Sequence, residues 1–149
     1  METDDAGERC RFREHVHNLD AGPFDVVMFS NLCYGLVPES RRRIASLAKA
    51  RGLLTSSGRI LLSYVGNTPR PYSRLVQVMK VLSTLRGSDW HPEQGDVLHP
   101  MASGRPRFHY EHLFIAGELE SEARAAGLRV LFHDDTTFDY WLAALAPSD

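Results

Sequence analysis

Polar and aromatic side chains follow two apolar runs of this sequence, at the points where the runs end. Ser30 and Asn31 come directly after the run Val26-Val27-Met28-Phe29, and Tyr34 lies a few residues further on. Tyr64 stands near the end of a second apolar run. Because ligands bind at the carboxyl ends of the strands in an open α/β sheet, these side chains are candidates for a small-molecule site. Packing under a loop is the alternative for Tyr34, and a cap or turn role is the alternative for Asn31.

A second group of chemistry-bearing residues lies in the later half of the chain. Trp90 stands in a stretch rich in glycine and proline, and His109, Tyr110 and His112 follow close to one another. Histidine titrates near neutrality, so His109 or His112 could act as the general base for an acceptor group. The alternative is catalysis without a base, in which alignment of the reacting groups is sufficient.

The sequence lacks the motifs of a metal site and of a hydrolase. His15 and His17 would share one face of a strand, but no further ligand stands nearby at the spacing of a metal site, so we expect no metal. The chain has no Gly-x-Ser-x-Gly elbow, no P-loop and no zinc motif, which argues against a hydrolase.

The sequence of the first half of the chain indicates the strands and the helix that position the candidate residues at the ends of the two apolar runs. Residues 10–16 alternate as a strand does, and a strand over residues 24–31 contains a continuous apolar run at 26–29, as in a strand buried on both faces. A helix beginning at Pro38 follows and stops before a turn ending in Gly58, and its Arg41-Arg42-Arg43 run belongs mostly to the solvated face. With a further strand over residues 59–65, this order predicts a right-handed βαβ unit.

The sequence of the second half indicates a segment that could cover the candidate site, and the last strands of the sheet. We expect a helix over residues 71–85, an irregular stretch over 86–108, a helix over 116–126, and strands over 128–133 and 138–145. A loop as long as the irregular stretch is usually functional or disordered, so it is either a substrate lid or mobile filler.

Composition limits the class of protein. The 149 residues, 43% of them hydrophobic, suit one globular domain, and the net charge of −2 gives no electrostatic case for nucleic acid or an anionic membrane. No apolar run approaches the roughly 20 residues that a membrane-spanning helix needs. The two isolated cysteines suit a reducing cytoplasm, where we expect the protein to be located.

Three segments in order carry a resemblance to a known family. The sequence contains Phe24-Asp25-Val26-Val27, then Arg51-Gly52-Leu53-Leu54 before Ser57-Gly58-Arg59-Ile60-Leu61-Leu62, and later Ala125-Ala126-Gly127-Leu128-Arg129-Val130. It resembles the fourth to sixth strands, with their helices, of class I S-adenosylmethionine-dependent methyltransferases. The resemblance implies an α/β fold with a partial Rossmann-like methyltransferase sheet, mostly parallel, with an antiparallel last strand and flanking helices.

The resemblance also assigns expected roles. It implies S-adenosylmethionine as cofactor, with Ser30 and Asn31 at the cofactor. The side chains expected at a small-molecule acceptor are Tyr34, Tyr64, Trp90 and Tyr110. The methyltransferase-like domain would span residues 10–146 with a lid-like insertion at about 67–108, behind a disordered leader over residues 1–9.

One feature of the family is missing from the sequence. The glycine-rich cofactor turn would precede residue 10, where only a short polar segment stands. The chain therefore resembles the carboxyl-terminal portion of the domain, and three interpretations stay open. It is a methyltransferase or its carboxyl-terminal portion, a non-catalytic module that pairs with a partner chain, or an incomplete gene product. Without its usual neighbour, the strand over 24–31 would be an apolar edge, which predicts a homodimer, a heteromer or aggregation.

Overall fold

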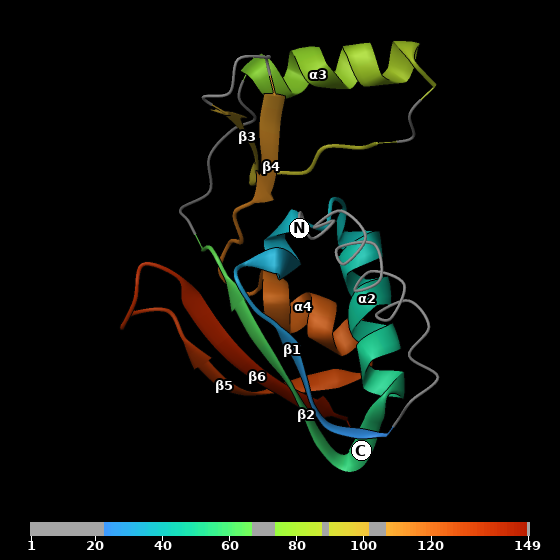
Figure 1. The fold of residues 1–149 in the computed structure, drawn as a ribbon, viewed down its shortest axis with the longest axis vertical. Coiled ribbons are helices and arrows are strands. Elements are labelled where there is room, and N and C mark those ends of the chain that lie inside the picture. The colour runs from blue at the N-terminus through green and yellow to red at the C-terminus, as the bar shows by residue number, and fades with distance from the viewer. Residues whose placement is uncertain (1–22, 67–73, 88–89, 102–106, 149) are drawn as a thin grey trace, which may run out of the picture.

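A four-stranded sheet forms the base of the molecule (Figure 1). The computed structural model of the chain describes residues 23–66, 74–87, 90–101 and 107–148. The strand order is β1-β2-β6-β5, with β1 at Phe24–Phe29, β2 at Leu54–Tyr64, β5 at Leu128–Asp134 and β6 at Trp141–Pro147. β1 runs parallel to β2, and β6 runs antiparallel to β2 and to β5. Three strands thus share one direction, which confirms the predicted mostly parallel sheet with an antiparallel last strand.

Two helices cover one face of this sheet and build the core with it. They are α2, Ser40–Gly52, and α4, Glu118–Ala125, seen together on one side of the strands in Figure 1. Leu47 of α2 and Leu119 of α4 are buried against Ile60 and Leu62 of β2 and Leu145 of β6. Burying such aliphatic side chains contributes roughly 1.5–3 kcal/mol each, so this interface fixes the helices on the sheet.

The opposite face of the sheet corrects the prediction that β1 is buried on both sides. Met28 is 62% exposed. It lies opposite Leu61, which lies opposite Ala144, which in turn lies opposite Phe132. Phe132 is 56% exposed. This apolar row crosses all four strands, and no helix in the described part of the chain covers it; we call it the outer face.

A helix and a two-stranded hairpin lie beyond the sheet (Figure 1). The sequence predicted the helix, but it predicted an irregular stretch over residues 86–108 in place of the hairpin. The hairpin pairs β3, Asp96–Met101, with β4, Arg107–His112, in antiparallel register. The prediction missed β3 because Pro100 argues against a strand, but a strand with a single neighbour tolerates proline. The helix is α3, Arg74–Leu85, which contacts β3 and lies apart from the sheet (Figure 1).

Other element boundaries differ by a few residues from the sequence prediction. α2 begins at Ser40 instead of Pro38, because Glu39 has a positive φ of 68° and cannot belong to the helix. The last strand begins at Trp141 instead of residue 138. The predicted strand over 10–16, with His15 and His17, lies outside the described residues. None of the described helices is long and apolar enough to cross a membrane.

Candidate functional site

The loop after β1 places the first two candidates at the carboxyl edge of the sheet. Ser30 and Asn31 are exposed there. Asn31 and Leu32 both have left-handed backbones, with φ of 52° and 60°, which turn the chain away from the strand. The Leu32 amide donates to Ser63 Oγ of β2 at 3.1 Å, so the turn is held against the neighbouring strand. The edge thus presents small polar groups, as a ligand site requires.

Two of the three tyrosines predicted at the acceptor, Tyr34 and Tyr64, lie in the core. Tyr34 is fully buried, stacks on Phe114 with ring centroids 5.4 Å apart, and donates its hydroxyl to Glu122 Oε2 at 2.6 Å. Tyr64 is also buried, and its hydroxyl is 2.8 Å from His133 Nε2. Burial raises the pKa of both hydroxyls above the usual value, and Glu122 raises that of Tyr34 further. Neither phenol can act as a base near neutrality.

Arg43 lies at the centre of a buried charge cluster, although the sequence assigned it to the solvated face of α2. Its side chain is 0% exposed, and the guanidinium lies 5.2 Å from the Phe114 ring centroid. Nε donates to Glu122 Oε1 at 3.0 Å, while NH2 donates to Glu93 Oε2 at 2.9 Å and Glu118 Oε1 at 3.1 Å. The arginine therefore joins α2 to α4 and to the segment before β3.

Burial shifts the pKa of Arg43 in one direction, and its acidic partners shift it in the other. Burial by itself lowers the pKa of the guanidinium, but hydrogen bonds and the charges of Glu122, Glu93 and Glu118 outweigh it and raise the pKa. Arg43 is therefore a permanent cation inside the protein. Its planar fork of donors suits several carboxylates at once, which a lysine could not satisfy.

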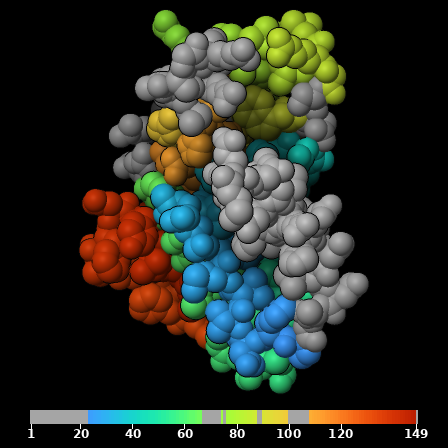
Figure 2. All heavy atoms as spheres, in the orientation of Figure 1, coloured from blue at the N-terminus to red at the C-terminus, as the bar shows by residue number. Residues whose placement is uncertain are grey.

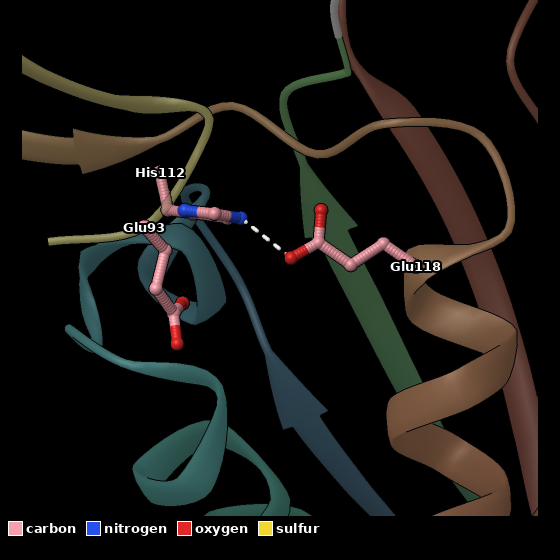
Figure 3. A group of neighbouring side chains, drawn as sticks. All are labelled: Glu93, His112 and Glu118. Atoms are coloured by element: carbon pink, nitrogen blue, oxygen red, sulfur yellow. Dashed lines mark hydrogen bonds and ion pairs between the residues drawn. The ribbon is translucent and has the colours of Figure 1, made fainter. Parts of the chain in front are cut away.

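His112 continues this cluster toward the hairpin. The fully buried ring has Nδ1 2.8 Å from Asp96 Oδ1 and Nε2 2.8 Å from Glu118 Oε1; Figure 3 shows the second contact. A carboxylate can only accept, so a ring nitrogen that faces each carboxylate must donate to it. Burial lowers the pKa of His112, but the hydrogen bonds to Asp96 and Glu118 outweigh this effect and raise it. The ring is thus held as an imidazolium.

The arrangement of Glu93, His112 and Glu118 has the donor types of a metal site. Their ligand atoms lie within 4.8 Å of one another, as Figure 3 illustrates. However, the Arg43 guanidinium already contacts both glutamates, and the hydrogen bond from His112 to Glu118 uses the nitrogen that a metal would need. We therefore interpret the cluster as a structural ion network whose cations are Arg43 and His112.

A cavity of about 300 Å³ lies between the start of α2, α3 and the hairpin. Its lining residues are Pro38, Glu39, Arg42, Met79, Trp90, Leu98 and Tyr110. Trp90 and Tyr110 meet edge to face, with ring centroids 6.3 Å apart. The structure thus brings together two residues that the sequence had proposed for the acceptor but could not place beside each other. A cavity of this size and lining is at the lower end of those that bind small molecules.

The cavity lies beyond the carboxyl ends of β1 and β2. Gly35, in the 3-10 turn Cys33–Leu36 after β1, packs so closely on the end of β4 that an added Cβ would lie 3.0 Å from the His112 carbonyl oxygen. The Phe114 amide, just after β4, donates to the Val65 carbonyl at 2.8 Å, just after β2. Both contacts fasten the hairpin to the same sheet edge that carries Ser30 and Asn31.

The two predicted general bases are placed apart from the cavity lining. His109 is exposed on β4, opposite His99 of β3, and strand alternation directs it away from the face that carries Tyr110. His112 shares the Tyr110 face, but both of its ring nitrogens are engaged. Tyr110 itself donates its hydroxyl to Asp96, and burial with this bond raises its pKa.

Comparison with known proteins identifies the fold. No family model matches the chain, and no curated protein sequence matches it. Among solved structures, the methyltransferase CcbJ from Streptomyces caelestis matches with a TM-score of 0.55 and 16% identity, over 89% of this chain and 60% of its own. An S-adenosylmethionine-dependent methyltransferase from Clostridium acetobutylicum matches with a TM-score of 0.57 and 11% identity, over 97% and 71% of the two chains.

A third structure agrees with these two. A SAM-dependent methyltransferase from Methanosarcina mazei matches with a TM-score of 0.58 and 13% identity, over 86% of this chain and 61% of its own. The chain therefore has the fold of class I S-adenosylmethionine-dependent methyltransferases and spans roughly 60–70% of the length of these structures. This confirms the fold and the partial extent predicted from the sequence.

Proposed function

We propose that this chain is the acceptor-binding portion of an S-adenosylmethionine-dependent methyltransferase that acts on a small molecule. One observation carries the proposal. In a methyltransferase fold, Trp90 and Tyr110 line a cavity of about 300 Å³ beyond the strand ends where Ser30 and Asn31 are exposed. Ligands of open α/β sheets bind at such strand ends, so the cavity is in the right place for the acceptor.

The residues have separate roles in this proposal. Bound S-adenosylmethionine supplies a methyl group on a sulfonium, and Ser30 and Asn31 would contact its polar parts. Trp90, Met79 and Leu98 would pack against the acceptor. Since His112 and Tyr110 have their protons committed to carboxylates, we expect the chain to act by aligning the acceptor instead of deprotonating it.

Chemical-shift mapping of backbone amides by NMR tests the cofactor part. Because the described residues offer only Ser30 and Asn31 as predicted cofactor contacts, we expect weak, millimolar binding of S-adenosylmethionine that shifts residues 30–34. Exposed Ser57, at the opposite end of β2, serves as the internal reference and should not shift. Shifts confined to other regions, or micromolar affinity of the monomer, would contradict the proposal as stated.

A non-catalytic module that pairs with a partner chain is the second candidate, favoured by the outer face. Exposed Met28 and Phe132 end an apolar row across the whole sheet, and β1 has one strand neighbour among the described residues. Apolar sheet surfaces and open strand edges usually mark contacts with other protein. A chain that forms a stable complex but never binds S-adenosylmethionine, even within that complex, would favour this candidate.

A further inference from the structure

The hydroxyl proton of Tyr110 points toward Asp96. The hydroxyl donates to Asp96 Oδ1 at 2.7 Å, and the Asp96 side chain is 0% exposed. The same Oδ1 accepts from His112 Nδ1 at 2.8 Å, and Oδ2 accepts from the Glu93 amide at 2.8 Å. A phenol has one proton, so the remaining hydrogen-bonding capacity of the Tyr110 oxygen is its lone pairs.

The groups around His112 keep this direction from reversing. Its ring faces Asp96 of β3 and Glu118 of α4, with Arg43 of α2 and Glu93 beside Glu118. The imidazolium donates to Asp96 and balances its negative charge. Asp96 is therefore held as an acceptor of three hydrogen bonds, and rotation of the Tyr110 hydroxyl toward the cavity would leave the buried Oδ1 with His112 as its one remaining donor, which costs the hydrogen bond to the phenol.

Building on the proposed acceptor site, we propose that Tyr110 presents a hydrogen-bond acceptor to the cavity and thereby selects small aromatic molecules that carry an O–H or N–H donor. Asp96 and His112 are the positioning residues of this selection. The aromatic part follows from the walls, because Trp90, Met79 and Leu98 offer an indole face and apolar side chains in a space suited to a small ring system.

The other polar groups of the cavity are already engaged in part. Glu39 is buried, pairs with Arg41 Nε and accepts from the His91 amide at 3.2 Å. Arg42 Nε lies 3.7 Å from Glu39 Oε2. A ligand donor could in principle approach Glu39 instead of Tyr110, so a test of the proposal must separate the two residues.

Phenol and its methyl ether anisole form the matched probe pair. They share one ring, but only phenol has an O–H donor. Their affinities are measured from the indole ¹H–¹⁵N signal of Trp90, which is assigned by its loss in Trp90→Phe. We expect phenol to bind wild-type protein about five-fold more tightly than anisole, the size of one ordinary hydrogen bond.

Three variants assign the preference to its residue. Tyr110→Phe should bind both probes equally, and Glu39→Gln should retain the preference for phenol. Asp96→Asn should reduce the preference, because an amide can donate to the Tyr110 oxygen. If Asp96→Asn does not fold, Tyr110→Phe and Glu39→Gln still decide the question.

Several results would overturn the proposal. Equal affinity of wild-type protein for phenol and anisole, or no binding of either, would remove its basis. A preference that survives in Tyr110→Phe and disappears in Glu39→Gln would assign the selection to Glu39. The assay contains no cofactor, so its outcome is independent of the S-adenosylmethionine mapping that tests the proposed function.

Discussion

Removal of the Arg43 side chain should strongly destabilise the protein. Glu122 is 2% exposed, and in Arg43→Ala the Tyr34 hydroxyl would be its remaining side-chain donor among the described residues. Glu118 and Glu93 are 18% and 30% exposed and can recover part of their hydration, so the main loss comes from Glu122. Leaving a buried charge without its partner costs about 3–5 kcal/mol.

That loss is a large part of the total stability of a domain of this size, which is about 5–15 kcal/mol. For a chain of about 150 residues it corresponds to a fall in Tm of roughly 6–20 °C. Urea unfolding followed by circular dichroism would measure the free energy of unfolding directly. Lys49→Ala is the matched control, because Lys49 is an exposed cation on the same helix and should change stability by less than about 0.5 kcal/mol.

A double variant distinguishes the loss of an ion pair from the loss of packing. Arg43→Met with Glu122→Leu removes both buried charges and keeps most of the volume, so it should recover much of the stability that Arg43→Met alone loses. The reasoning would be refuted if Arg43→Ala destabilised by less than about 1 kcal/mol. It would also be refuted if the double variant were no more stable than Arg43→Met.

Three further predictions concern other parts of the structure. The pKa of His112 is raised in the folded state, so the stabilisation by its imidazolium is present below the ordinary pKa of 6.5 and is lost as the pH rises through the folded pKa. Urea midpoints should therefore fall less steeply with rising pH in His112→Gln than in wild-type protein, and identical slopes would contradict this prediction. Tyr34→Phe should destabilise by about 1–3 kcal/mol by leaving Glu122 with one donor fewer, and unchanged thermal unfolding would contradict that. Sedimentation at low micromolar concentration should detect self-association, and Met28→Lys should weaken it. If wild-type protein and Met28→Lys are both monomeric, the outer face and the β1 edge do not cause association.

The sheet and its main helices could be predicted from the sequence because their signals are local. Continuous apolar runs, a helix start after a proline and a glycine after the last helix each reflect nearby residues. The resemblance then supplied the mostly parallel sheet with its antiparallel last strand. Burial on the outer face could not be predicted, because the apolar run of residues 26–29 is the same whether or not another element covers Met28.

The candidate site was predicted less completely, since it depends on contacts between distant segments. Trp90 and Tyr110 were proposed separately, and only the hairpin brings them to one cavity. Arg43 looked like a surface charge within an arginine run, although its position four residues before Leu47 placed it on the buried face of α2. Asp96 offered no local signal at all, because its role arises from its pairing with His112.

The most direct test of the proposed function is whether cofactor and acceptor bind side by side. Transferred nuclear Overhauser effects suit weak ligands and report close contacts between them. Anisole cannot be methylated at oxygen. With S-adenosylmethionine and anisole both present, we predict a cross-peak between the sulfonium methyl protons and the anisole ring protons. The cross-peak should disappear in Trp90→Ala, in which the cavity loses an aromatic wall. Binding of both ligands without any such cross-peak would contradict the assignment of this cavity as the acceptor site of a methyltransferase.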